Sequence, residues 1–300
     1  MNIQLGVDLG GTKIEIIALD GNGATLLRRR VTTPGGDYPA ILATIKNLVL
    51  AADTELGARY PVGFGTPGSA SPVDGRMRNC NSTCLNGKNL HEDLAQLLER
   101  PVAIANDANC FALSEAADGA GAGAKSVFGV IIGTGAGAGI VIDGKLLEGA
   151  NGVAGEWGHN PLPWPRDDER PGPVCYCGKS GCVETFISGP GLKLDHHNVT
   201  QQLLEPREIV SRANRGNSAC AATMHRYEDR LARALAHVIN ILDPEVIVLG
   251  GGMSNIERLY DNVPRLWPRY VFSDVVQTQL RGNTHGDSSG VRGAARLTIR

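Results

Sequence analysis

Two glycine-rich turns, each set between apolar runs, constrain the fold of this chain more than any other feature. Apolar runs at 3–7 and 14–19 flank the first turn, Asp8 to Lys13, and both are typical of strands, so the glycines form the bend of a hairpin. A second strand, glycine turn and strand follow at 127–142, with the turn at Gly133 to Gly139. Two similar hairpins in one chain indicate a duplicated architecture whose halves face each other across a cleft. Because strands follow both turns, the pattern excludes a Rossmann or P-loop site, which requires a helix there.

The first turn has the chemistry of a phosphate site. Gly10 and Gly11 carry no Cβ, so their N–H groups can lie against an anion, while Thr12 and Lys13 add a hydroxyl donor and a cation. An ordinary tight hairpin would also explain two adjacent glycines. The acid at Asp8 and the second glycine turn favour the polyphosphate interpretation.

Composition sets the outer bounds. With 300 residues, 42% of them apolar and 20% charged, the chain can form two globular domains of ordinary size. The net charge of −2 implies no broad basic surface for nucleic acid. The N-terminus lacks a signal-peptide pattern and no run approaches transmembrane length, so we expect no membrane partner and a cytoplasmic location. In that compartment the seven cysteines are expected to be thiols or metal ligands.

Asp107 is the candidate general base. It follows a short strand at 102–105 and precedes a helical stretch at 110–117. A carboxylate in that position can take a proton from an attacking hydroxyl, although it can equally be a helix N-cap. The Gly/Ala-rich segment 119–124 is typical of a linker between domains.

One histidine and three cysteines lie in a loop-rich, proline-rich segment and match the ligand set of a closed, structural zinc site. These are His159, Cys175, Cys177 and Cys182. Unrelated core thiols are the alternative. The other cysteines and a histidine pair have no such spacing, and we expect the former to be small buried residues and the latter to lie at the surface: Cys80, Cys84, Cys110, Cys220, His196 and His197.

Three further segments complete the pattern. Gly250 to Gly252 follow a buried strand at 246–249 and would let a purine or ribose approach the backbone, unless they form only a flexible turn. The polar loop 79–86 suits a polyhydroxylated ligand, and a plain surface loop explains it equally well. Amphipathic helices are predicted at 38–52, 90–99 and 222–242.

Taken together, the first glycine turn, Asn106-Asp107, the second glycine turn, Gly155 to His159, the three cysteines and Gly250 to Gly252 resemble the ROK family of bacterial sugar kinases. The resemblance runs over essentially the whole chain in the family's order. Within the family, four short motifs are most similar to the fructokinases, and less similar to the N-acetylglucosamine kinases or glucokinases: Asn81 to Thr83, Leu85 to Gly87, Trp157 to Trp164 and Thr185 to Gly189.

The resemblance implies an α/β protein with the two-domain actin/hexokinase-like, ribonuclease H-like fold and a central cleft for ATP and sugar. The expected domains are residues 1–118 and 119–287, the second with the zinc-binding loop, and a final helix at 288–300 packs back on the first. The implied reaction is ATP-dependent phosphorylation of a hexose at the 6-hydroxyl, D-fructose to D-fructose 6-phosphate, with mannose as a further substrate. An N-acetylglucosamine kinase or glucokinase is the alternative. A homodimer and no nucleic-acid partner are expected.

The resemblance also assigns roles. Asp107 would be the base and Asp8 would help to hold Mg²⁺. The residues around ATP and Mg²⁺ would be Gly6, Val7, Asp8, Leu9, Gly10, Gly11, Thr12, Lys13, Gly133, Thr134, Gly135, Ala136, Gly137, Ala138, Gly139, Ile140, Gly250, Gly251 and Gly252. The residues around the sugar would be Gly68, Asn81, Asn106, Asp107, Glu156, His159 and Glu184. His159 would bind Zn²⁺ through one ring nitrogen and the sugar through the other.

Two other functions fit the family. Its transcriptional repressors carry a winged helix-turn-helix before the sugar-binding part, and only seven residues precede Asp8 here. A sugar sensor without catalysis would have no need of Asp107 together with both phosphate turns. The sequence therefore favours a kinase.

Overall fold

The computed structural model describes residues 3–298, which form two compact units. The first comprises 3–122, 144–154 and 284–298, and the second comprises 123–143 and 155–283. The chain therefore passes between the units more than once, and the short segment 144–154 groups with the first unit, which no feature of the sequence indicated.

The first unit is built on a mixed five-stranded sheet of order β3-β2-β1-β4-β7. Strands β1, β2 and β3 pair antiparallel, and β1, β4 and β7 pair parallel. The elements of this unit are β1 (Gln4–Leu9), β2 (Lys13–Leu19), β3 (Thr25–Thr32), α1 (Tyr38–Leu56), β4 (Val62–Thr66), β5 (Ser69–Ala70), β6 (Met77–Arg78), α2 (Leu90–Leu98), β7 (Val102–Asn106), α3 (Asp107–Asp118), β10 (Lys145–Leu146) and α9 (Ser289–Arg296).

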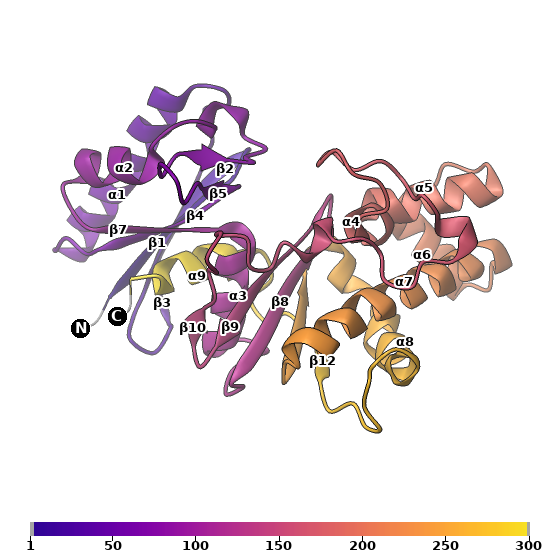
Figure 1. The fold of residues 1–300 in the computed structure, drawn as a ribbon. Helices are drawn as coiled ribbons and strands as arrows, with labels where there is room; N and C mark the ends of the chain where they lie inside the picture. Colours follow the sequence, from indigo (N-terminus) through magenta and orange to yellow (C-terminus); the bar gives the residue numbers. More distant parts are fainter. Residues whose placement is uncertain (1–2, 299–300) are drawn as a thin grey trace. The chain divides into compact units, whose positions relative to one another are not determined.

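Helices cover both faces of this sheet because side chains alternate along its strands. In β2, Ile14 and Ile16 belong to the core that includes residues of α1 and α2, whereas Ile17 and Leu19 pack with α9. Figure 1 shows α1 and α2 on one side of the strands and α3 and α9 on the other.

Helix α9 approaches the sheet very closely. A Cβ at Gly63 would lie 1.8 Å from the carbonyl oxygen of Ala294, and one at Gly6 would lie 2.3 Å from the backbone nitrogen of Ala295. These glycines allow the backbones to touch. The helix expected at the end of the chain thus forms and packs on β1 and β4; residues 299–300 of the expected range lie outside the described residues.

The second unit repeats the pattern, with strands in the order β9-β8-β11-β12. Strands β8 and β9 form an antiparallel hairpin, and β8, β11 and β12 run parallel. The elements of this unit are β8 (Ser126–Ile132), β9 (Ala136–Ile142), α4 (Val183–Ile187), α5 (Gly189–Thr200), α6 (Pro206–Asn214), α7 (Ser218–Leu242), β11 (Val246–Gly250), α8 (Arg258–Leu266) and β12 (Gln279–Gly282). The predicted α/β class and the paired hairpins are confirmed.

Helix α7 is the longest element of the second unit. The side chain of Asn217 accepts a hydrogen bond from the Cys220 N–H and caps its start, while Asp243 adopts the left-handed conformation at its end, before Pro244. Its apolar residues enter the main core of the unit.

The expectation of a surface histidine pair is wrong for His196. This side chain is 0% exposed, and its Nδ1 lies 2.9 Å from the hydroxyl of Thr223. The reason is that His196 lies on the face of α5 that packs against α7. His197 is half-buried.

Within residues 3–298, no helix combines the length and the apolar character needed to cross a lipid bilayer. The cytoplasmic location stays a prediction.

Candidate functional site

In the first unit, two carboxylates lie at the carboxyl ends of neighbouring parallel strands. Asp8 in β1 is in register with Gly65 of β4, and Gly65 is in register with Ala105 of β7, which leads to Asp107. A Cβ on Gly65 would lie 3.4 Å from Oδ1 of Asp8. The strand between the two acids therefore contributes no side chain that would separate them.

The two carboxylates influence each other. Burial raises the pKa of Asp8 to about 6, and the charge of Asp107 contributes to the shift. The Asp107 side chain is accessible to solvent, yet desolvation by the surrounding protein also raises its pKa, opposed by a hydrogen bond from the Ala108 N–H at 2.8 Å. Two adjacent acids with raised pKa values are typical of a functional site.

The helix cap beside Asp107 is Asn106. Its Oδ1 accepts a hydrogen bond from the Asn109 N–H at 2.7 Å, and α3 begins at Asp107. Asp107 therefore is not the N-cap that the sequence left open. Asn106 was predicted to contact the sugar. Its only side-chain oxygen, Oδ1, is engaged in the cap, and its amide NH₂ group is left for such a contact.

The first glycine turn lies beside the polar loop. The Gly10 N–H donates to the carbonyl oxygen of Lys13 at 3.0 Å, and a Cβ on Gly11 would lie 3.3 Å from the hydroxyl of Ser82. Gly11 and Thr12 are exposed at its tip. By contrast, three residues of the predicted phosphate set are buried inside β1 and have a structural role: Gly6, Val7 and Leu9.

The predicted sugar residues of the first unit lie around the same loop. Gly68 has a φ of +70° and would collide with the Arg78 carbonyl oxygen if it carried a Cβ. Asn81 is exposed, and its Oδ1 accepts a hydrogen bond from Ser82 at 2.8 Å. Asn86 bonds both the N–H and the carbonyl of Cys80. The loop is therefore built by its own side chains.

In the second unit, the tip of the β8–β9 hairpin is closed by a hydrogen bond from the Gly133 N–H to the Gly135 carbonyl at 2.9 Å. Thr134 is exposed, and a Cβ on Gly133 would meet nothing within 4 Å. At the end of β11, Gly251 has a φ of +79° and a Cβ there would lie 2.4 Å from the Ile132 carbonyl oxygen. A Cβ on Gly252 would meet nothing within 4 Å, so the backbone of Gly252 is accessible to a ligand. Gly251, by contrast, is required for packing against Ile132.

Glu184 connects the glycine turn to the cysteine loop. Its Oε2 accepts a hydrogen bond from the Ala136 N–H at 2.8 Å, and its Oε1 lies 4.0 Å from Sγ of Cys175. A cavity of about 220 Å³ is lined by Thr134, Cys175, Tyr176 and Glu184, among others. Parts of the predicted phosphate, sugar and metal sites of this unit thus line one cavity.

The four predicted zinc ligands do come together. One ligand atom from each of His159, Cys175, Cys177 and Cys182 lies within 4.8 Å of all the others. Sγ of Cys177 is 3.6 Å from Sγ of Cys182, and Nδ1 of His159 is 3.6 Å from Sγ of Cys175. Two thiolates on a tetrahedral Zn²⁺ are about 3.8 Å apart. The donor set therefore fits the metal.

The two ring nitrogens of His159 face different groups. While Nδ1 faces the thiols, Nε2 lies 3.0 Å from the hydroxyl of Tyr176 and 4.0 Å from Oε2 of Glu156. The division agrees with a residue that holds a metal through Nδ1 and a ligand through Nε2.

Some contributions were missed by the sequence analysis. Gly65 was not among the predicted site residues, although its place between Asp8 and Asp107 follows from strand register. Tyr176, whose hydroxyl lies 3.0 Å from Nε2 of His159, was not predicted either. Only the second role of Glu184, as an acceptor for the hairpin, had no signal in the sequence.

Comparison with known proteins identifies the family of this chain. The sequence model of the ROK family matches residues 4–300. The chain is 39% identical over 298 residues to an N-acetyl-D-glucosamine kinase of Yersinia enterocolitica, covering 98% of each protein. It is 40% identical over 294 residues to an N-acetylgalactosamine kinase of Shewanella sp. (strain ANA-3), covering 97% of this chain and 95% of that one. A ROK family glucokinase from Streptomyces griseus, solved in complex with glucose and AMPPNP, superposes with a TM-score of 0.75 at 28% identity, covering 99% of both chains.

Proposed function

This chain belongs to the ROK family and is a sugar kinase, and from that premise we propose that it transfers a phosphoryl group from ATP to the 6-hydroxyl of N-acetyl-D-glucosamine. The observation that carries the substrate is the 39% identity, over 98% of both chains, to an N-acetyl-D-glucosamine kinase. The fold matches that of a glucokinase that binds AMPPNP, an ATP analogue, so ATP is the donor.

Fructose, the substrate expected from Trp157 to Trp164 and Thr185 to Gly189, is not supported by the relatives. Its rank in the sequence analysis depended on short motifs near the sugar loop, whereas the similarity to the N-acetylhexosamine kinases extends over the whole chain. Selectivity among hexoses depends on a few hydrogen bonds, and local motifs do not position them. We therefore assign fructose a lower rank than the amino sugars.

In the proposed reaction, the Asp107 carboxylate accepts the proton of the 6-hydroxyl as that oxygen attacks the terminal phosphorus of ATP. Its raised pKa makes it a stronger base than an ordinary aspartate. Asp8 would hold Mg²⁺, which neutralises phosphate charge, and the N–H groups at both glycine turns would bind the phosphates.

In the second unit, Glu156, His159 and Glu184 would bind sugar hydroxyls. Zn²⁺ on His159, Cys175, Cys177 and Cys182 would fix the loop that carries His159. Because Glu184 also accepts from the Ala136 N–H, sugar contact and phosphate turn would be held in one arrangement.

The substrate is tested with a panel of sugars, ATP and Mg²⁺, with ADP release coupled to a spectroscopic signal. We expect kcat/KM to be highest for N-acetyl-D-glucosamine, by roughly tenfold or more over glucose, mannose and fructose, since the lost acetamido contacts would leave polar groups unpaired. A higher kcat/KM for fructose or glucose would overturn the assignment, and the absence of sugar-dependent ADP release with every sugar of the panel would reject the kinase.

N-acetyl-D-galactosamine is the second candidate. The 40% identity to the Shewanella kinase is as high as that to the N-acetylglucosamine kinase, and the two sugars differ only in the configuration at C4. Including both in the panel decides between them. The homodimer stays a prediction, and size-exclusion chromatography with light scattering tests it.

The base is tested with Asp107→Asn. We expect kcat to fall by roughly a hundredfold or more, while the dissociation constant for sugar changes little, because the amide retains the shape but accepts no proton. Calorimetric titration of the sugar measures the second quantity. A variant that keeps more than about a tenth of the wild-type kcat would remove Asp107 from this role.

A further inference from the structure

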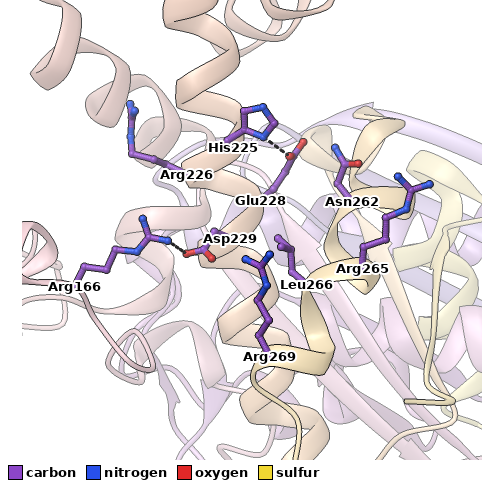
Figure 2. A pocket seen from close by; sticks show the side chains of 9 residues that line it. All are labelled: Arg166, His225, Arg226, Glu228, Asp229, Asn262, Arg265, Leu266 and Arg269. Atoms are coloured by element: carbon purple, nitrogen blue, oxygen red, sulfur yellow. Dashed lines mark hydrogen bonds and ion pairs between the residues drawn. The ribbon is translucent and has the colours of Figure 1, made fainter. Parts of the chain in front are cut away.

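A second cavity of the second unit lies apart from every residue assigned above to the base, the metals, ATP or the sugar. It has a volume of about 400 Å³, within the range of small-molecule sites. Figure 2 shows it between α7, α8 and the segment that carries Arg166. The lining residues are mainly basic: Arg166, His225, Arg226, Glu228, Asp229, Asn262, Arg265, Leu266 and Arg269.

The two acids of this cavity are already paired. Asp229 accepts hydrogen bonds from Nη2 of Arg166 at 2.9 Å and from the Tyr270 hydroxyl at 2.7 Å, and it lies 3.0 Å from Nε of Arg233. Glu228 pairs with Arg258 and lies 3.6 Å from Nδ1 of His225. Their negative charge is therefore largely neutralised.

The cations of the cavity are in excess. Arg265 and Arg269 are exposed, and within residues 3–298 neither guanidinium has a hydrogen-bond or ion-pair partner. Arg166 is 56% exposed and uses only part of its guanidinium on Asp229. In Figure 2, Arg269 reaches between Asp229 and Leu266, toward the side from which Arg166 enters.

Helix geometry explains part of this arrangement. Arg265 lies in the last turn of α8, where a cation interacts favourably with the helix dipole. The dipole does not explain why Arg166, from a distant segment, meets Arg269 around the same hollow. An anionic ligand would explain why Arg166, Arg265 and Arg269 all line this cavity.

We infer that this cavity binds a phosphorylated monosaccharide. Guanidinium groups bind phosphate through two parallel hydrogen bonds, and Arg166, Arg265 and Arg269 supply them. Leu266 offers an apolar surface, and Asn262 and His225 offer hydrogen-bonding groups for sugar hydroxyls.

Binding here would act on the sugar loop, a consequence that rests on the proposed function. A phosphate that engages the part of the Arg166 guanidinium not used by Asp229 brings a second anion beside this ion pair and would shift the position of Arg166. The Arg166 N–H also donates to Glu169 at 2.9 Å, and Glu169 accepts from Arg230 and Arg233 of α7 at 2.7 Å each. This segment lies between His159 and Cys175 in the chain, so its displacement would change sugar affinity, and linkage makes the effect reciprocal.

Binding is tested by calorimetric titration of N-acetylglucosamine 6-phosphate, glucose 6-phosphate and inorganic phosphate into the full-length protein at constant ionic strength. AMPPNP and N-acetylglucosamine are present in excess, so that the active site is occupied. The double variant Arg265→Gln/Arg269→Gln is compared with Arg207→Gln, which removes an exposed arginine on α6 away from the cavity.

We expect wild type and Arg207→Gln to bind one sugar phosphate per chain, and the double variant to bind it roughly tenfold or more weakly, with an unchanged thermal midpoint. Equal binding by the double variant, or binding that disappears when the active site is occupied, would overturn the site. Inorganic phosphate binding as tightly as either sugar phosphate would overturn the choice of ligand.

The regulatory consequence has its own measurement. Added sugar phosphate should change the KM for sugar in wild type and leave it unchanged in the double variant, with the basal kcat the same in both. If sugar phosphate binds without any change in KM, the proposed coupling is wrong, while the proposed binding site still holds. An enzyme inactive on every sugar would reject the proposed function, and the titration would still report on the cavity.

Discussion

Asp8 lies in an environment that favours its protonated form. Burial and the nearby charges of Asp107 and Glu15 raise its pKa from 3.8 to about 6. Because the folded state holds the proton more tightly than the unfolded chain, ionisation costs stability as the pH rises from about 4 through 6, and the whole cost is present above that range.

Asp8→Asn should therefore stabilise the fold while it abolishes activity. Without Mg²⁺ at pH 8, we expect a gain on the order of 1–3 kcal/mol in the free energy of unfolding, since the amide carries no charge. The gain should shrink as the pH falls below 6. Urea unfolding at pH 8 and pH 4.5 measures it, and a variant no more stable than wild type at pH 8 would show that the repulsion is absent.

Two glycines of the second turn are expected to differ sharply. A Cβ on Gly133 meets nothing, so Gly133→Ala should keep the wild-type thermal midpoint and raise the KM for ATP by roughly tenfold, because the methyl group would displace a phosphate. A Cβ on Gly135 would lie 2.6 Å from Oε2 of Glu184, so Gly135→Ala should weaken sugar and ATP together. Unchanged ATP kinetics in Gly133→Ala would exclude phosphate contact there.

Single residues show where sequence reasoning ends. The strand-end positions of Asp8 and Asp107 and the clustering of the four predicted zinc ligands could be predicted, because strand ends and ligand spacing are local patterns. The need for glycine at 135 and at 251 could not be predicted. A Cβ at 135 would collide with Glu184 and one at 251 with Ile132, and each of these partners is distant in the chain. Nor did the sequence show that Asn106 is the cap, because an Asp side chain at 107 can accept such a bond as well.

At the scale of elements, the cysteine loop carries a clear prediction. Cys177 is exposed, so Cys177→Ser should fold. If Zn²⁺ fixes His159 as proposed, the variant should lose about one Zn²⁺ per chain and bind sugar roughly tenfold or more weakly. Metal analysis by mass spectrometry and sugar titration measure the two effects. Cys84→Ser, outside the cluster, is the matched control for metal content, and full sugar affinity of Cys177→Ser without metal would contradict the role of the ion.

Element ends were predicted less well than their existence. The sequence places a helix at 222–242, but α7 begins at Ser218 because Asn217 caps it. Likewise, α3 begins at Asp107 and not at 110 because Asn106 caps it. In each case a single side-chain bond extends a helix beyond its apolar period.

At the scale of the whole molecule, Glu115 joins segments that are far apart in the chain. This carboxylate is 0% exposed and accepts hydrogen bonds from the N–H groups of Thr284 and His285 at 3.0 and 3.2 Å and from the Ser289 hydroxyl at 2.8 Å. It also accepts from the Ala120 N–H at 2.9 Å. The chain first leaves the first unit after residue 122 and finally returns to it at residue 284. One side chain, Glu115, thus binds the segments next to both points.

Glu115→Ala should lower the free energy of unfolding by about 3 kcal/mol or more, since several donors would lose a buried acceptor. Glu55→Ala removes an exposed carboxylate paired with Arg29 in the same unit and should cost less than about 1 kcal/mol. Urea denaturation compares them, and equal losses would mean that the buried bonds contribute little. The sequence could not predict this contact, because nothing local relates residue 115 to residue 284.

The close packing of α9 against β1 and β4 also has a consequence for folding during synthesis. Ribosomes deliver a chain from its amino end, and domains generally fold in that order. Here the face of the first sheet that α9 covers carries only α3 until residues 289–296 emerge (Figure 1), while the whole of the second unit, 123–143 and 155–283, is available earlier. The first unit can therefore complete its native packing only near the end of translation, after the whole of the second unit has been made.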